Sequence, residues 1–264
     1  QSIDVSTIYE VPILMLKEGL DTIVLKKLGL PYNKKVKLKK WMQFLDRLQN
    51  PKQKITIGLV GKYVELKDAY KSISEAITHA GAENSCRVEI KWLHAEKINQ
   101  SNVETQLSKL KGVIVAPGFG DRGIEGKISA IKYVREKNIP FLGICLGMQS
   151  AVIEFSRNVL KLKDANSTEM QPQTSEPVID LMNKQKNITE KGGTMRLGAY
   201  DCHLQNNSNA YNAYKVKNIS ERHRHRFEFN NKYKAKLESA GLIATGINKK
   251  NNLVEVIEIP KHSW

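Results

Sequence analysis

The chain has 264 residues and a formal net charge of +15, with 41% hydrophobic and 26% charged residues. This length allows a sizeable buried core, and the composition is that of an ordinary globular protein. We find no run of about 18 apolar residues and no signal-peptide pattern at the start, so we expect no membrane partner. Three widely spaced cysteines without a Cys-x-x-Cys pair argue against a zinc site and fit a reducing cytoplasm.

The basic excess would suit nucleic acid or an anionic small molecule. Lysines crowd residues 34–40 and 184–191, in stretches typical of a linker and a loop, without the interleaved aromatic residues of single-strand binding. We therefore interpret most of this charge as solvated surface and expect no nucleic-acid partner. Attraction of nucleotides at the edge of a larger enzyme is the minority interpretation.

The first fifty residues have a different pattern from the rest. Residues 11–30 place apolar side chains at helical spacing, and this pattern ends at Gly29 and Pro31. Residues 34–50 are lysine-rich and only partly amphipathic, and Asn50-Pro51 closes them. We interpret residues 31–51 as a linker.

From residue 52 onward, strand patterns alternate with helix patterns. Short apolar runs at residues 55–60, 87–93, 112–116 and 139–143 predict strands, and amphipathic stretches separate them. This alternation predicts an α/β fold with a mainly parallel sheet flanked by helices. Active sites in such sheets lie at the carboxyl ends of the strands.

One thiol lies at such a strand end. Cys145 stands between Gly143 and Gly147, where the last predicted strand gives way to a helix. This pattern indicates a nucleophile elbow, since flanking glycines allow backbone and helix to approach closely. The helix N-terminus is expected to favour the thiolate. A buried structural cysteine is the plainer alternative.

A second glycine cluster competes with this interpretation. Residues 118–123 match Gly-x-Gly-x-x-Gly between a strand and a helix, which favours a dinucleotide-binding domain. However, the motif is not on the first strand of the unit, and Glu136 falls within a helix and not at a strand end. The same turn could instead present backbone N–H groups to an oxyanion. No Gly-x-x-x-x-Gly-Lys-Ser/Thr occurs, so ATP chemistry must lie elsewhere.

Five segments together resemble the glutaminase domain of the CTP synthase family, which belongs to the class I (triad) glutamine amidotransferases. They are residues 115–123, 143–149, 164–169, 192–198 and 221–228. The resemblance covers residues 52–264, and residues 4–12 resemble the end of the family's synthetase domain. It implies a flavodoxin-like amidotransferase fold with an N-terminal helical extension. Three parts are expected: residues 1–30 as the tail of the synthetase domain, 31–51 as a linker, and 52–264 as the amidotransferase domain.

The resemblance implies hydrolysis of L-glutamine to glutamate and ammonia, which a synthetase domain would use to aminate UTP to CTP. No cofactor is implied for this domain. ATP and Mg²⁺ would act in the synthetase domain, GTP would be an activator, and the full-length protein would be a cytoplasmic homotetramer.

The family's site residues map onto this chain one by one. Cys145 would be the nucleophile that forms a glutamyl thioester. Gly118 and Leu146 would supply the oxyanion-binding N–H groups. The glutamine pocket would comprise Gly118, Phe119, Leu146, Gly147, Met148, Gln149, Glu169 and Arg226.

Within that pocket, Glu169 and Arg226 would hold the amino and carboxylate groups of the substrate, and the chemistry suits a zwitterion. The alternative for Arg226 is a structural ion pair with Glu228.

The chain also departs from the family's pattern at the catalytic base. The family's base is the His of a His-Pro-Glu segment that would follow Trp264, so the base and its orienting acid are expected outside the chain. None of the six histidines is a good substitute: His223 and His225 belong to the Arg-His-Arg-His-Arg segment, and His262 precedes the expected strand. Ala116-Pro117-Gly118 also replaces the common Pro-Gly-Gly and predicts a stiffer loop. An incomplete triad leaves a third alternative, a non-catalytic regulatory or oligomerisation piece.

Overall fold

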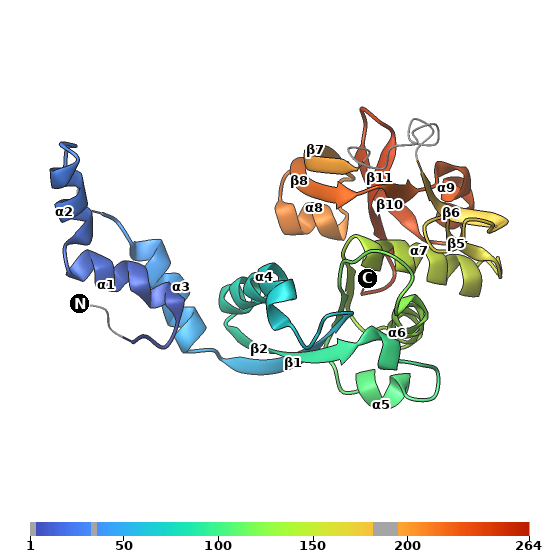
Figure 1. Ribbon diagram of the computed structural model, residues 1–264, viewed down its shortest axis with the longest axis horizontal. Coiled ribbons are helices and arrows are strands. Elements are labelled where there is room, and N and C mark those ends of the chain that lie inside the picture. Colours follow the sequence, from blue (N-terminus) through green and yellow to red (C-terminus); the bar gives the residue numbers. More distant parts are fainter. Residues whose placement is uncertain (1–3, 33–35, 182–194, 264) are drawn as a thin grey trace. The chain divides into compact units, whose positions relative to one another are not determined.

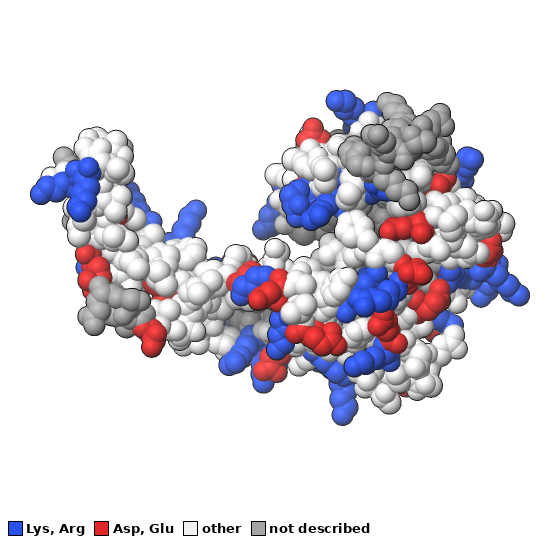
Figure 2. Space-filling model, viewed as in Figure 1, with Lys and Arg blue, Asp and Glu red and all other residues white. Residues whose placement is uncertain are grey.

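The computed structural model describes residues 4–32, 36–181 and 195–263 (Figure 1). The chain divides into two compact units, residues 1–55 with 72–89, and residues 56–71 with 90–264. The lysine cluster at residues 184–191 and residues 192–194 of the glycine-rich motif lie outside the described residues. Where described, lysine and arginine side chains are spread among acidic ones on the face that Figure 2 shows, without gathering into one patch.

The first unit is helical apart from strand ends. It contains η1 (Ile8–Glu10), α1 (Val11–Lys17), α2 (Leu20–Lys27), α3 (Lys39–Gln49) and most of α4 (Lys71–Glu83). The single helical pattern expected over residues 11–30 is divided into two helices, because Gly19 takes a left-handed φ of 68° between them. The lysine-rich stretch is not simply extended: α3 forms there and buries Leu45.

The sheet that carries the elbow has the strand order β2-β1-β3-β4. Its strands are β1 (Gln53–Gly61), β2 (Cys86–His94), β3 (Val113–Val115) and β4 (Phe141–Gly143). Strand β3 pairs in parallel with both β1 and β4. The four strands predicted from apolar runs are therefore confirmed, and so is the α/β fold class.

Helical segments lie between and after these strands in the chain. They are η2 (Lys67–Tyr70), η3 (Ala95–Lys97), α5 (Val103–Leu107), α6 (Ile124–Glu136) and α7 (Leu146–Asn158). Helix α7 packs against α6 and β4, and Ile131 and Ile153 between them are fully buried. Each such side chain stabilises the fold by about 1.5–3 kcal/mol, so the helix that follows the thiol is firmly held.

Two further sheets complete the second unit, and periodicity did not predict them. One is antiparallel with the order β11-β10-β7-β8 and comprises β7 (Arg196–Leu204), β8 (Asn218–His225), β10 (Ile243–Asn248) and β11 (Leu253–Glu258). The other has the order β5-β6-β9 and comprises β5 (Ala165–Ser167), β6 (Glu176–Leu181) and β9 (Phe227–Phe229). Helix α8 (Asn209–Tyr214) lies between β7 and β8, and η5 (Asn231–Tyr233) and α9 (Lys234–Ser239) lie between β9 and β10. Helix α7 also packs against β5, β6 and β9. The helix that follows the elbow therefore contacts both the first sheet and the sheet β5-β6-β9.

No helix within residues 4–32, 36–181 and 195–263 has the length and apolar character that crossing a membrane requires.

Candidate active site

The elbow predicted at Cys145 is present. Strand β4 ends at Gly143, α7 begins at Leu146, and Cys145 between them has φ 56° and ψ −108°. A non-glycine residue with such angles is strained, and strain of this kind persists only where the surroundings impose it. Here the Ile144 N–H donates to the Val115 carbonyl and the Gly147 N–H to the Ile144 carbonyl, which fix the turn from both sides.

Both flanking glycines are required by close packing. A Cβ added to Gly147 would lie 2.1 Å from the Val115 carbonyl oxygen, and one added to Gly143 would lie 2.7 Å from the Gly147 carbonyl carbon. Neither distance is tolerable for real atoms, so any side chain at these positions would push α7 away from the sheet. The sequence interpretation of the two glycines is confirmed.

The electrostatics of the thiol differ from expectation. Burial raises the pKa of Cys145, while a hydrogen bond from the Leu146 backbone and the charge of Lys127 lower it without cancelling that effect. Glu169 and Glu228 add to the increase. The helix N-terminus favours the thiolate as expected, through the Leu146 N–H, but desolvation outweighs this effect and the pKa is raised overall. A base is needed to remove the proton.

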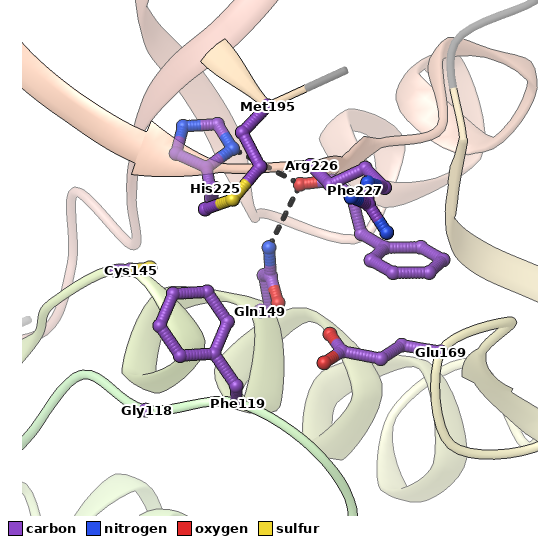
Figure 3. A pocket seen from close by; sticks show the side chains of 9 residues that line it. All are labelled: Gly118, Phe119, Cys145, Gln149, Glu169, Met195, His225, Arg226 and Phe227. Carbon is purple, nitrogen blue, oxygen red and sulfur yellow. Dashed lines mark hydrogen bonds between the residues drawn. The ribbon is translucent and has the colours of Figure 1, made fainter. Parts of the chain in front are cut away.

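A cavity of about 100 Å³ opens beside the thiol. It is lined by Gly118, Phe119, Cys145, Gln149, Glu169, Met195, His225, Arg226 and Phe227. Figure 3 shows Cys145 at one side of this cavity and Glu169 and Arg226 at the other, with Gln149 between them. The nucleophile and five of the eight residues predicted for the pocket are thus brought together.

The other three predicted residues lie outside the lining. Leu146 and Gly147 are buried in the first turn of α7, and Met148 packs against the main core. Only backbone groups of Leu146 and Gly147 are therefore available near the thiol, and the Leu146 N–H is already directed at the sulfur.

Hydrogen bonds fix the polar side chains of the cavity. The Gln149 side-chain amide donates to the Phe227 carbonyl at 2.9 Å, and the Glu169 carboxylate accepts from the Gly120 N–H at 2.8 Å. Phe119 is 52% exposed at the mouth. The loop after β3 and the turn after β5 are thereby tied together across the cavity.

Three lining residues were missed from the sequence: Met195, His225 and Phe227. His225 and Phe227 flank Arg226 within the segment 221–228 that carries the family resemblance, and that position was the signal that could have found them. His225 Nδ1 lies 3.2 Å from the Phe227 carbonyl and its Nε2 lies 2.8 Å from Nδ1 of His223. Burial lowers the pKa of both histidines to about 4, so both are neutral at pH 7. With both nitrogens engaged, His225 is poorly suited to act as the base.

A buried charged cluster lies behind His225. Arg196 bonds to Glu228 at 3.1 Å and to Glu255 at 2.7 Å, and its guanidinium lies 4.3 Å from the ring centroid of Tyr200. Glu228, which was considered as a partner for Arg226, is therefore paired with Arg196. His223, His225 and Glu255 place three potential metal-ligand atoms within 4.8 Å of one another. However, Glu255 already bonds to Arg196, and Nδ1 of His223 and Nε2 of His225 bond to each other.

Comparison with known proteins decides the family. Residues 65–263 match the model of the family described as Glutamine amidotransferase class-I. The chain belongs to this family. Within the class I amidotransferases it is 61% identical over its whole length to the CTP synthase of Christiangramia forsetii, of which it covers 48%, and 54% identical to that of Bacteroides fragilis, of which it covers 50%.

Among solved structures, the CTPS glutaminase domain of Trypanosoma brucei with bound acivicin aligns with a TM-score of 0.74 and 34% identity. That alignment covers 79% of this chain and 82% of the other. The chain spans about half the length of the curated relatives it matches and corresponds to their C-terminal glutaminase domain. The resemblance found in the sequence motifs is confirmed.

Proposed function

We propose that this amidotransferase domain hydrolyses L-glutamine at Cys145. The observation that carries the proposal is the arrangement of the cavity, with a strained thiol at one side and a carboxylate and a guanidinium at the other. Glu169 would bind the substrate ammonium group and Arg226 its carboxylate, which places the side-chain amide toward the sulfur. The acivicin held by the related glutaminase domain is a glutamine analogue, which supports the same substrate here.

The reaction would proceed through a thioester. The Cys145 sulfur forms a bond to the amide carbon, and the resulting oxyanion accepts hydrogen bonds from the N–H groups of Gly118 and Leu146. Collapse of this intermediate breaks the C–N bond, and the protonated nitrogen leaves as ammonia. Water then cleaves the thioester, which releases glutamate and restores the thiol.

The proton transfers need a base. The raised pKa of Cys145 means that a thiol must be deprotonated during attack. By the family resemblance we assign this role to the His of the family's His-Pro-Glu segment. Gln149 and the backbone of Gly147 and Met148 would shape the pocket around the stem of the substrate, with Phe119 over its open side.

The relatives that match are CTP synthases, and this supports a wider proposal for the full-length protein. Ammonia would pass to a preceding synthetase domain that aminates UTP at the expense of ATP with Mg²⁺, with GTP as activator, in a cytoplasmic homotetramer. Residues 1–30 would be the tail of that domain and residues 31–51 the linker, with α3 inside it.

The test uses the full-length protein and two nitrogen sources. Replacing Cys145→Ser should abolish CTP formation from glutamine and leave formation from added ammonium chloride intact, because only the first route needs the thiol. Cys86→Ser, which changes another buried thiol, serves as the control and should retain both. Retention of glutamine-dependent activity in Cys145→Ser would refute the assignment.

A further inference from the structure

Two lysines are buried beside the loop that follows β3. Lys127 on α6 is 0% exposed and Lys62, directly after β1, is 5% exposed. Neither lines the cavity. Lysine side chains are almost never fully buried without a compensating interaction, so their positions call for a specific reason.

Lys127 holds the start of the loop. Its Nζ donates to the Ala116 carbonyl at 2.9 Å, while the Ala116 N–H donates to the Val60 carbonyl at 2.9 Å. The next residue is Pro117, whose ring fixes φ. When the Ala116 carbonyl is held and φ of Pro117 is fixed, ψ of Pro117 is the main backbone torsion angle that still sets the direction of the Gly118 N–H.

Lys62 holds the other end of the same loop. Its Nζ donates to the Phe119 carbonyl and, at 3.3 Å, to the Gly120 carbonyl. The N–H of the Phe119–Gly120 peptide donates to Glu169 at 2.8 Å. This peptide is therefore held at both its carbonyl and its N–H, and Gly118 lies between two restrained peptides.

The ammonium of Lys127 is also close to the reacting groups. A Cβ added to Gly118 would lie 3.7 Å from Nζ of Lys127, and the charges that act on Lys127 are those of Lys62 and Cys145. Burial and the charge of Lys62 lower the pKa of Lys127 to about 8, so it is mostly protonated at pH 7. The groups that act on the thiol itself are the Leu146 N–H, Lys127, Glu169 and Glu228.

We propose that Lys127 is a positioning residue of the glutaminase: it holds the Ala116 carbonyl so that the Gly118 N–H is directed at the developing oxyanion. The same ammonium acts on Cys145 from behind the Gly118 turn. This inference rests on the proposed function. Lys127 does not line the cavity, because it contacts the loop from the side that faces away from the substrate.

The test compares three variants of the full-length protein. Lys127→Met removes both the hydrogen bond and the charge, Lys127→Gln removes the charge and keeps a donor, and Lys132→Met makes the same change on the same helix as a control. Three quantities are measured: glutamine hydrolysis, the rate of Cys145 alkylation by iodoacetamide against pH without glutamine, and the midpoint of thermal unfolding.

We expect kcat of Lys127→Met to fall by about 10- to 100-fold, less than the roughly 10²- to 10³-fold that follows loss of an oxyanion donor. KM should change little, and ammonium-dependent CTP formation should stay at the control level. Lys127→Gln should retain more of kcat than Lys127→Met. In both variants alkylation should slow several-fold at neutral pH and its inflection should move to higher pH.

Two outcomes would overturn the proposal. One is an alkylation profile and a kcat of Lys127→Met that match the Lys132→Met control. The other is a loss of activity and alkylation in both Lys127 variants that only follows their loss of thermal stability. The alkylation rate is measured without glutamine, so it does not depend on the proposed substrate. If the proposed substrate were wrong, the unmodified protein would not hydrolyse glutamine, and this result is distinct from the two above.

Discussion

Gly147→Ala is the substitution for which the structure makes the sharpest prediction. The added Cβ would lie 2.1 Å from the Val115 carbonyl oxygen and 3.0 Å from its carbonyl carbon, both backbone atoms that cannot rotate away. Real Cβ contacts are essentially never under 3.0 Å, so α7 and the end of β3 must separate by 0.9 Å, the difference between 3.0 and 2.1 Å. Cys145 is the N-cap residue of this helix and moves with it.

Gly147→Ala is expected to lower both the reaction rate and the free energy of unfolding. A displacement of about 1 Å at a reacting group lowers the rate by roughly 10²-fold, and overpacking a rigid contact destabilises a fold by about 1–3 kcal/mol. Glutaminase kcat and urea unfolding of the full-length protein measure these parts separately. Gly112→Ala is the matched control, since its Cβ would meet the nearest atom at 3.4 Å. A Gly147→Ala protein with kcat within about twofold of the control would refute the packing argument, because a twofold change is only about 0.4 kcal/mol.

Three further predictions follow from the charged groups. Glu169→Gln should lower kcat/KM for glutamine by about 10- to 100-fold, the loss of one charged hydrogen bond, with ammonium-dependent synthesis unchanged; an unchanged kcat/KM would contradict the assigned role. Arg196→Met leaves Glu228 and Glu255 without their buried partner and should cost about 3–5 kcal/mol in urea unfolding; a cost below about 1 kcal/mol, typical of exposed pairs, would contradict it. Burial raises the pKa of Glu228 from 4.5 to about 7, so its contribution to stability is present below 4.5 and is lost as pH rises through about 7. Glu228→Gln should therefore gain thermal stability relative to the unmodified protein between pH 5 and about 7, and a pH-independent difference between the two would contradict the raised pKa.

The elbow and its sheet could be predicted from the sequence because local chemistry determines them. Short apolar runs indicated β1 to β4, and the two glycines around Cys145 indicated a close approach that the distance to Val115 confirms. The family resemblance supplied Glu169 and Arg226, which lie far along the chain from Cys145 and yet line the same cavity. Periodicity alone could not have joined them.

Other features could not be predicted because they depend on tertiary contacts. Strand β8 has a polar sequence and is formed by pairing with β7, so no apolar run indicated it. The raised pKa of Cys145 results from burial by distant segments, which outweighs the local helix end. The positions of Lys62 and Lys127 follow the same rule: a lysine in a sequence suggests surface, and only the packed loop shows why these two are buried.

Covalent labelling tests the central claim, that Cys145 is the glutamine-directed nucleophile, most directly. The full-length protein is incubated with acivicin and digested, and the modified peptide is identified by mass spectrometry. We predict a single adduct on Cys145, protection by excess glutamine, and no adduct in the Cys145→Ser protein. An adduct on Cys86 or Cys202, or labelling that glutamine does not slow, would contradict the assignment.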